Sequence, residues 1–391
     1  MQFTGDMKKI NALAVIGTRP EAIKMAPVVR ALRATGRFEV YVLFTGQHRG
    51  LLDRAAADFG LTADADLDLM RPDQGLASLT ARLLEGIEGV LAARPFDVVL
   101  AQGDTTTVLA AALTAFYRRI PFAHVEAGLR TESIDSPFPE EANRRLAGAL
   151  TTIHFAPTRG ALANLLAEGV PADRIVVTGN TGIDALLDAS GRAPELPVAV
   201  SPVDRLVLVT LHRRESLGAP LRGVLGAIRD AIAGVPRARV VWPVHPNPHV
   251  QQAAKEMLGD VPGVELVEPQ GYLPFVSLMK RADVIVTDSG GVQEEAPTFG
   301  APILVVRETT ERPEGVEAGL AELVGTDPER IARRLGTLLT TGVRRTRTVN
   351  PYGDGRASLR IADSLIQMLG TRSAMNSTVP VVIPTRALKV A

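Results

Sequence analysis

Short apolar runs rich in Val, Ile and Leu recur along the whole chain and end at glycine or polar residues. They are residues 10–16, 39–44, 97–101, 122–125, 206–211, 240–244, 264–267, 284–287 and 302–306. Apolar residues at helical spacing follow several of them, as in residues 76–91. Strands that alternate with helices form a parallel doubly wound sheet, and ligands bind outside the carboxyl ends of its strands. The predicted fold class is therefore α/β.

The length of the chain and a proline-rich break predict two domains. A chain of 391 residues, 46% of them hydrophobic, can build two separate cores. The periodicity stops between Arg192 and Asp204, where prolines stand at positions 194, 197 and 202. We interpret this segment as an interdomain linker.

Composition argues against several classes of function. Lys plus Arg and Asp plus Glu both number 43, so no global field attracts nucleic acid or an anionic membrane. The absence of cysteine excludes disulfides, thiolate metal sites and a cysteine nucleophile. The sequence has no signal-peptide core and no uncharged apolar run of about 18 residues, and we expect a cytoplasmic protein. No two histidines stand at helical metal-binding spacing, so no bound metal is expected.

The segment VIVTDSGGVQEE, residues 284–295, predicts a phosphate-binding turn. A buried strand, a tight turn and a helix would follow one another, with the N–H groups of the first helical turn pointing outward. Gly290 and Gly291 let the backbone approach a ligand, and Ser289 offers a hydroxyl. The two glutamates at the end of the segment would hold a sugar attached to the phosphate. The alternative is that the glycines only make the turn.

Cationic side chains occupy other strand ends. Arg19 and Lys24 lie in the turn GTRPEAIK, which lacks the glycines of the dinucleotide fingerprint, so nicotinamide binding is disfavoured. Two cations at a helix N-terminus suit a diphosphate, and solvated surface charges are the alternative. His212 ends another apolar run beside two arginines, where it needs an anion nearby.

Carboxylates follow two apolar runs of the first half. Asp104 and Glu126 both come after such a run, so they would face one crevice. Asp104 could instead cap the helix that follows it. Glu140 and Glu141 stand near the start of a later helix, where one would serve the helix dipole and the other the chemistry.

A series of motifs, in this order and spacing, resembles the non-hydrolysing UDP-N-acetylglucosamine 2-epimerases. They are GTRPEAIK (17–24), GQH (46–48), QGDTTT (102–107), HVEAGLRT (124–131), PEEANRR (139–145), HRRES (212–216), EPQGYLPF (268–275), TDSGGVQEEAP (287–297) and TERPE (310–314). The match runs from about Ala14 to Asp363. The three threonines after Asp104 differ from the hydrolysing relatives, which favours the reversible branch.

This resemblance implies two facing doubly wound, Rossmann-like domains of the glycosyltransferase-B (GT-B) architecture, with substrate in the cleft between them. We expect domains at residues 8–190 and 203–350, a helix at 355–370 that completes the first domain, and a tail at 371–391. Family members exchange UDP-N-acetylglucosamine and UDP-N-acetylmannosamine without a nicotinamide. A UDP-sugar substrate, no cofactor and a homodimer are therefore expected.

The resemblance also assigns roles to single residues. It implies that uridine, ribose and diphosphate are held by Gln270, Phe275, Ser289, Gly290, Gly291 and Glu295, and that Arg19, Lys24, His212 and Arg312 surround the diphosphate and sugar. Asp104, Glu126 and Glu140 match the acid–base carboxylates, and His212 is also a catalytic candidate. A hydrolysing epimerase, a GT-B glycosyltransferase and a catalytically silent nucleotide-sugar sensor are the alternatives.

The chemistry explains these residue types. Inverting C2 requires removal of a proton from a carbon with no adjacent carbonyl, so departure of UDP from C1 must assist. The implied intermediates are 2-acetamidoglucal and UDP, with cations stabilising the leaving group and carboxylates moving protons.

Some family members also bind a second UDP-N-acetylglucosamine as an activator beside the substrate. Gln47, His48 and Arg71 are candidates for such an allosteric site. A glutamine that contributes to it in those members is Gly50 in this chain. We therefore predict weakened but retained activation.

Overall fold

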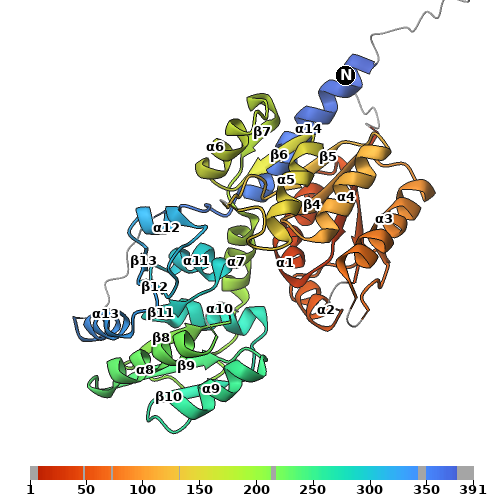
Figure 1. The fold of residues 1–391 in the computed structure, drawn as a ribbon. Coiled ribbons are helices and arrows are strands. Elements are labelled where there is room, and N and C mark those ends of the chain that lie inside the picture. The colour runs from red at the N-terminus through yellow and green to blue at the C-terminus, as the bar shows by residue number, and fades with distance from the viewer. Residues whose placement is uncertain are drawn as a thin grey trace, which may run out of the picture.

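The computed structural model describes residues 8–46, 49–71, 74–131, 133–212, 217–341 and 349–376. Two parallel sheets, each flanked by helices, form two domains that face each other (Figure 1). The predicted α/β fold with two Rossmann-like domains is confirmed. Among the described residues, no helix is long and apolar enough to cross a membrane.

The first domain contains a seven-stranded sheet with the order β3-β2-β1-β4-β5-β6-β7. Its strands are β1 (Ile10–Ile16), β2 (Phe38–Phe44), β3 (Ala65–Asp66), β4 (Val98–Gln102), β5 (Phe122–Val125), β6 (Ile153–Ala156) and β7 (Ile175–Val177). Its helices are α1 (Arg19–Ala34), α2 (Arg49–Asp58), α3 (Leu76–Ala93), α4 (Thr106–Tyr117), α5 (Glu140–Leu150), α6 (Arg159–Ala167) and α7 (Thr181–Arg192). Strand order reverses between β1 and β4, which places a ligand-binding crevice at their carboxyl ends.

The second domain contains a six-stranded sheet with the order β10-β9-β8-β11-β12-β13. Its strands are β8 (Arg205–Thr210), β9 (Ala238–Pro243), β10 (Val264–Val267), β11 (Val284–Thr287), β12 (Ile303–Val305) and β13 (Ala321–Leu323). Its helices are α8 (Ala219–Ala233), α9 (Pro248–Leu258), α10 (Tyr272–Arg281), α11 (Gly290–Glu295), α12 (Pro313–Glu317) and α13 (Pro328–Thr341). Here the order reverses between β8 and β11, so the turns after these two strands form the second crevice.

The start of α1 illustrates how the sequence sets an element and positions a functional residue. Thr18 accepts the backbone N–H of Glu21, and the Glu21 carboxylate accepts the N–H groups of Gly17 and Thr18. Pro20 lies in the first turn, where a missing N–H costs nothing. This capping box fixes the direction of α1 and thereby places Arg19 and Lys24 at its amino end.

One of the apolar clusters of the structure spans both domains. A cluster of buried residues extends from β1 and α1 through Ala185, Leu186 and Ala189 of α7 to Leu206 and Ile285 of the second sheet. Helix α7 packs against both α10 and α11. The crevices of the two sheets are therefore held against each other by packing as well as by the chain connection.

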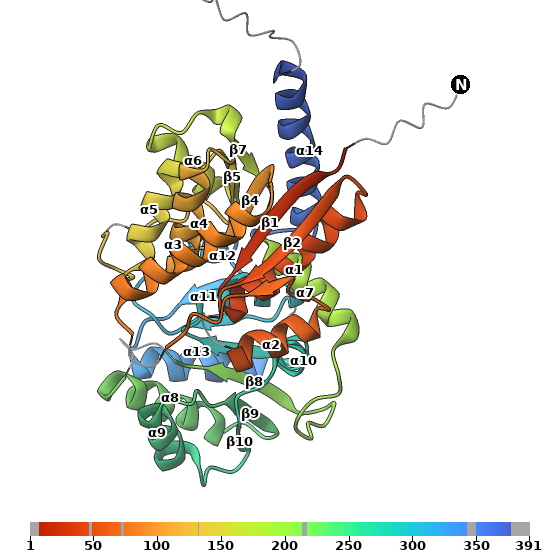
Figure 2. The same ribbon diagram turned by 90° about the vertical axis from the view of Figure 1, so that its right-hand side faces the viewer.

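The last described helix, α14 (Ala357–Asn376), returns to the first domain. It packs against α1 and α7 (Figure 2). The expected helix at 355–370 is present, and it continues to Asn376, so residues 371–376 are helical. The rest of the expected tail, residues 377–391, lies outside the described residues.

Candidate active site

Residues at strand ends of both domains meet in one pocket. A cavity of about 370 Å³ is lined by Arg19 of the first domain and by His212, His245, Gln270, Phe275 and Ser289 of the second. The structure brings together five predicted site residues from separate turns, namely Arg19, His212, Gln270, Phe275 and Ser289.

The predicted phosphate turn lies at the edge of this pocket. Ser289 occupies the N-cap position of α11, and Gly290 follows as its first residue. The Arg312 guanidinium lies against Gly290 so closely that a Cβ there would stand 3.0 Å from its Cζ atom. A side chain at position 290 would therefore crowd the Arg312 guanidinium, so glycine here allows the close approach of a cation to the turn.

Gln270 lines this pocket, and Glu295 contacts Tyr272, another residue of its lining. The Glu295 carboxylate accepts a hydrogen bond from the Tyr272 hydroxyl at 3.0 Å. Burial raises the pKa of Glu295 to about 7, although the Tyr272 hydrogen bond acts in the opposite direction. Burial also lowers the pKa of Arg19, and the nearby Glu295 carboxylate opposes that shift. The Gln270 amide donates to the carbonyl of Glu268 at 2.7 Å.

His212 is held by Asp288, which was not among the predicted site residues. Asp288, fully buried, accepts the His212 backbone N–H at 2.9 Å and lies 2.9 Å from the ring Nδ1. This carboxylate is the anion that a histidine beside arginines requires. A proton on Nδ1 donated to Asp288 leaves Nε2 as the second polar atom of the ring. Asp288 directly precedes Ser289, and its place at a strand end was the available signal.

A buried ionic cluster joins the two domains next to the turn. The Lys24 ammonium lies 2.6 Å from Glu126 of the first domain and 3.3 Å from Glu294 of the second. Glu294 also accepts from the Arg312 Nε at 2.9 Å and from the Asn180 amide at 3.0 Å. The solvated-charge alternative for Lys24 is therefore wrong, because its side chain is only 14% exposed.

The electrostatics of this cluster distinguish its members. Burial would lower the pKa of Lys24, yet Glu126 and Glu294 raise it above its usual value. Burial raises the pKa of Glu126, and Lys24 opposes that shift. Burial would also raise the pKa of Glu294, but Lys24 and Arg312 hold it below its usual range.

Glu126 is positioned by its own backbone as well. It has a φ of +63°, in the left-handed region that non-glycine residues seldom adopt. Its carboxylate accepts from the Gln102 amide at 3.0 Å in addition to Lys24. A conformation of this kind costs on the order of 1 kcal/mol and persists where the surroundings impose it.

Asp104 is held by two residues of α5. The Arg144 guanidinium lies 2.7 Å from its carboxylate, and the Asn143 amide donates to its carbonyl at 2.9 Å. Helix α4 has Thr105 at its N-cap position, so the interpretation of Asp104 as the cap is wrong. Glu140 is the first residue of the same helix α5. Its neighbour Glu141 is fully buried and pairs with Arg144 and Arg145, which gives Glu141 the structural role.

The predicted allosteric residues are only partly described. Gln47 and His48 lie outside the described residues. Arg71 is exposed, and its guanidinium donates to the carbonyl of Met70 at 3.3 Å. Within the parts of the chain that the structure describes, no group of three or more His, Asp or Glu could hold a metal ion.

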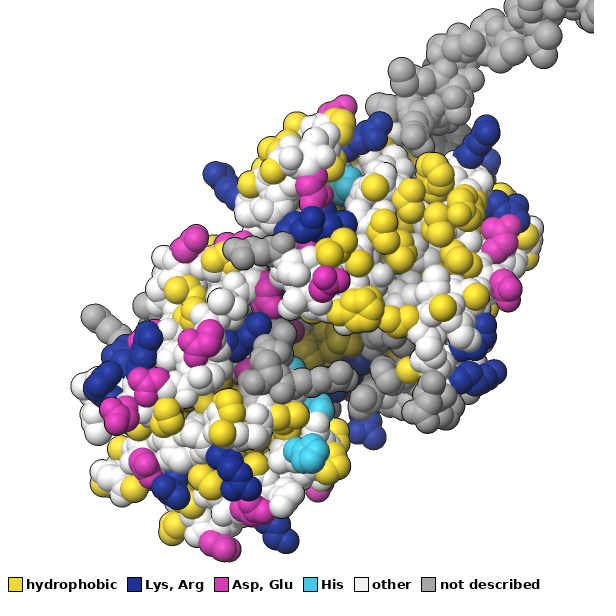
Figure 3. All heavy atoms as spheres, in the orientation of Figure 1, with side chains coloured by type: hydrophobic (Ala, Val, Ile, Leu, Met, Phe, Trp, Pro, Cys, Tyr) yellow, Lys and Arg dark blue, Asp and Glu magenta, His cyan; other side chains and the backbone are white. Residues whose placement is uncertain are grey.

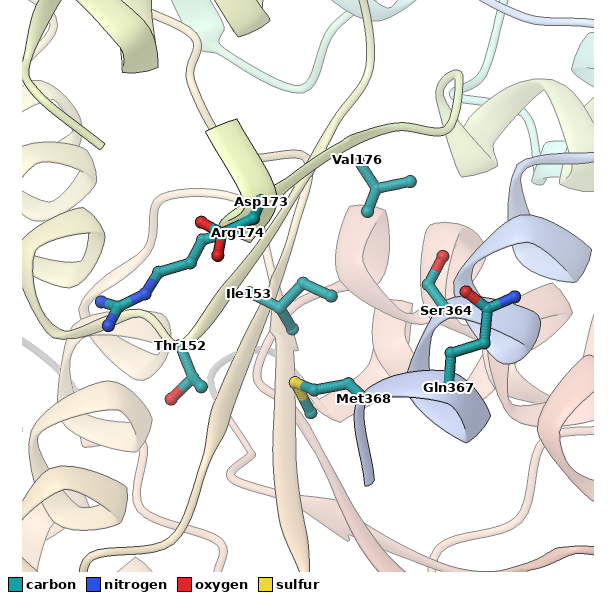
Figure 4. A pocket seen from close by; sticks show the side chains of 8 residues that line it. All are labelled: Thr152, Ile153, Asp173, Arg174, Val176, Ser364, Gln367 and Met368. Atoms are coloured by element: carbon teal, nitrogen blue, oxygen red, sulfur yellow. The ribbon is translucent and has the colours of Figure 1, made fainter. Parts of the chain in front are cut away.

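A second cavity, of about 420 Å³, lies near the amino ends of β6 and β7 (Figure 4). Thr152 and Ile153 at the start of β6, and Arg174 before β7, line it together with Ser364 and Met368 of α14. None of the predicted site residues lines it. The amino ends of parallel strands are not where such folds bind their ligands, so the first cavity is the candidate site.

Comparison with known proteins agrees with this geometry. Residues 30–366 match the family model described as UDP-N-acetylglucosamine 2-epimerase. The chain is 48% identical to the UDP-N-acetylglucosamine 2-epimerase of Salmonella typhimurium over 370 residues, which are 91% of this chain and 98% of that protein. It is 46% identical to the Bacillus subtilis protein of the same name, over 94% of this chain and 97% of that one.

Solved structures of UDP-N-acetylglucosamine 2-epimerases also resemble this chain. The UDP-GlcNAc 2-epimerase of Neisseria meningitidis, solved bound to UDP-GlcNAc, has a TM-score of 0.83 and 41% identity, over 92% of this chain and 100% of that one. A glycotransferase of kitacinnamycin, 16% identical with a TM-score of 0.62, shares the fold alone.

Proposed function

The chain belongs to the UDP-N-acetylglucosamine 2-epimerase family, and from this premise we propose that it interconverts UDP-N-acetylglucosamine and UDP-N-acetylmannosamine reversibly, without releasing free sugar. The observation that carries this proposal is the pairing of a buried carboxylate with buried cations. Glu126 touches Lys24, and Lys24 and Arg312 converge on Glu294 beside the phosphate turn. A group that can take a proton thus stands next to groups that can stabilise a leaving diphosphate.

The residues divide the work as follows. Arg19, Lys24 and Arg312 bind the diphosphate, and Phe275, Gln270 and Glu295 hold the uridine and ribose. The C1–O bond breaks with both electrons going to UDP, which makes the C2 proton acidic through the adjacent positive charge. A carboxylate, either Glu126 or Asp104, takes this proton and gives 2-acetamidoglucal.

Return of a proton from the other face, with re-addition of UDP at C1, gives the epimer. Asp104, Glu126 and Glu140 are the groups that hold these protons, and His212, oriented by Asp288, contacts the diphosphate or sugar. Water must be kept out, since it would trap the intermediate as free sugar.

The test is one incubation of UDP-N-acetylglucosamine alone in deuterated water. We expect an epimeric UDP-sugar that carries deuterium at C2, and labelled starting material at equilibrium. Epimer without deuterium would refute the proton-transfer mechanism. Free N-acetylmannosamine plus UDP would indicate the hydrolysing reaction. Unchanged substrate would favour a glycosyltransferase awaiting an acceptor, or a sensor.

A homodimer is part of the proposal. Phe116 and Tyr117 at the end of α4 are 57% and 67% exposed, and Leu146 of the neighbouring α5 is 54% exposed. Figure 3 shows apolar side chains gathered over this part of the first domain. We propose that a second copy of the chain covers this face. Sedimentation equilibrium would show a dimer that Tyr117→Glu converts to monomer, and a wild-type monomer would refute it.

A further inference from the structure

Glu294 is the residue through which the second domain reaches the proposed base of the first. It lies on α11, one turn beyond the phosphate turn, and its side chain is 4% exposed. One carboxylate oxygen accepts from Arg312, and the other accepts from Lys24 and Asn180. Lys24 and Asn180 belong to the first domain, so one buried side chain ties both domains together.

A cluster of this kind is costly to maintain. Removing ions from water carries a penalty that their attraction seldom repays in full, and an apolar replacement of similar volume is often as stable. Stability alone therefore gives little reason for four buried ionic groups at this place. The cluster contains the carboxylate at the end of β5 and the cation over Gly290, and this position points to catalysis.

We propose that Glu294 is a positioning residue of the epimerase site, whose carboxylate holds Lys24 against Glu126 and Arg312 over the phosphate turn when the two domains meet. This inference rests on the proposed function. Glu294 does not exchange a proton with substrate. It sets the two cations, and through Lys24 it sets the place and charge of Glu126.

The two carboxylates on Lys24 divide these roles by their surroundings. Glu294 faces two cations, which keep it an anion, whereas Glu126 faces Lys24 and the neutral amide of Gln102. The charged groups that act on Glu126 are Lys24 on α1, Glu294 on α11 and Arg312 before α12. Among them Glu294 raises the pKa of Glu126, which makes that carboxylate the readier acceptor of a proton.

The decisive variant is Glu294→Gln in the full-length protein. Its amide oxygen can still accept one hydrogen bond, but the charge and the remaining contacts are lost. We expect kcat to fall about tenfold or more, because a misplacement of ~1 Å can cost roughly 10²-fold. The acid limb of the kcat profile should also move to lower pH, since removing the negative charge lowers the pKa of Glu126. Thermal unfolding of the same sample gives the folded fraction.

Two further variants complete the experiment. Glu322→Gln removes a carboxylate that pairs with Arg334 on the surface of the second domain, and it should leave kcat and its acid limb unchanged. Glu294→Asp keeps the charge but shortens the side chain by one methylene. It should lower kcat with the acid limb in place, and it decides the matter if Glu294→Gln does not fold.

Two results separate this inference from the proposed function. Wild-type protein that does not epimerise its substrate refutes the proposed function. Active wild-type protein, with Glu294 variants that keep the wild-type kcat and acid limb, refutes the role of Glu294 alone.

Discussion

Replacing Glu126 by Gln tests the division of the site into a proton-transfer part and an anion-binding part. The two side chains are nearly isosteric, so the change removes proton transfer and charge and little volume. In the structure, Glu126 forms an ion pair of 2.6 Å with Lys24, and the variant loses it. The amide oxygen of the glutamine can still accept a hydrogen bond from Gln102 or Lys24. Acid–base catalysis by one residue contributes about 10²- to 10⁴-fold. We expect kcat to fall by about 10² or more.

Binding of UDP should respond differently. Lys24 keeps Glu294 at 3.3 Å as its partner, and losing the competing carboxylate leaves its charge more available to a diphosphate. The Kd of UDP, measured by calorimetry, should therefore stay within about threefold of wild type or decrease. Interconversion of the two UDP-sugars, followed by NMR, gives kcat on the same samples.

Arg312→Ala is the matched counterpart in the same cluster. Its guanidinium lies over Gly290, and hydrogen bonds to charged groups are worth about 1.5–3 kcal/mol, or roughly 10- to 150-fold in the Kd of UDP. Thermal unfolding checks that both variants fold, because each breaks a buried ion pair. The proposed division into proton-transfer and anion-binding groups is wrong if Glu126→Gln retains more than about a tenth of kcat, or if both variants bind UDP equally badly.

Two other predictions concern binding. Burial raises the pKa of Glu295 to about 7, and ribose hydroxyls would donate to its ionised form. Affinity for UDP-N-acetylglucosamine should therefore fall as pH drops below about 7, by up to about tenfold per pH unit. Glu295→Gln should flatten this slope in calorimetric titrations. Because Gly50 replaces a glutamine, activation by a second UDP-N-acetylglucosamine should be weakened by roughly two- to tenfold in effector affinity and not abolished. The reverse reaction, started from pure UDP-N-acetylmannosamine, should show a lag that a trace of UDP-N-acetylglucosamine shortens, and full initial velocity with no response would contradict this.

Most of the fold was predictable because buried parallel strands are continuous apolar runs. The runs at 10–16, 122–125 and 264–267 correspond residue for residue to β1, β5 and β10. The edge strands β3 and β13 were not predicted, because their sequences, Ala-Asp and Ala-Glu-Leu, do not form a continuous apolar run. Their pairing comes from the neighbouring strand, which is tertiary information.

The candidate site was predictable one turn at a time. Polar residues follow the apolar runs in the sequence, and this local pattern alone was enough to select Asp104, Glu126, Arg19 and His212. The partner of each group could not, because it lies on another element. Lys24 and Glu294 are 270 positions apart, and no local rule connects them.

Adjacent residues of one helix illustrate the same limit. Successive residues on a helix point about 100° apart, so Glu294 and Glu295 must face different surroundings. The structure turns Glu294 toward Lys24 and Arg312, and Glu295 toward Tyr272 at the edge of the pocket. The motif records two glutamates, and only the packing of α11 against α7 decides which one enters the interdomain cluster.

The charges of this cluster would couple two steps of the proposed mechanism, the departure of the leaving group and the transfer of the proton. With both carboxylates ionised, Lys24 and Arg312 balance Glu126 and Glu294, and the four charges sum to zero. In the proposed mechanism with Glu126 as the base, UDP gains one negative charge when the C1–O bond breaks, and the cluster gains one positive charge when Glu126 takes the C2 proton. The two changes compensate across Lys24, which touches the base and lies beside the diphosphate turn. Each step therefore lowers the electrostatic cost of the other, and a buried site of low dielectric makes that coupling strong.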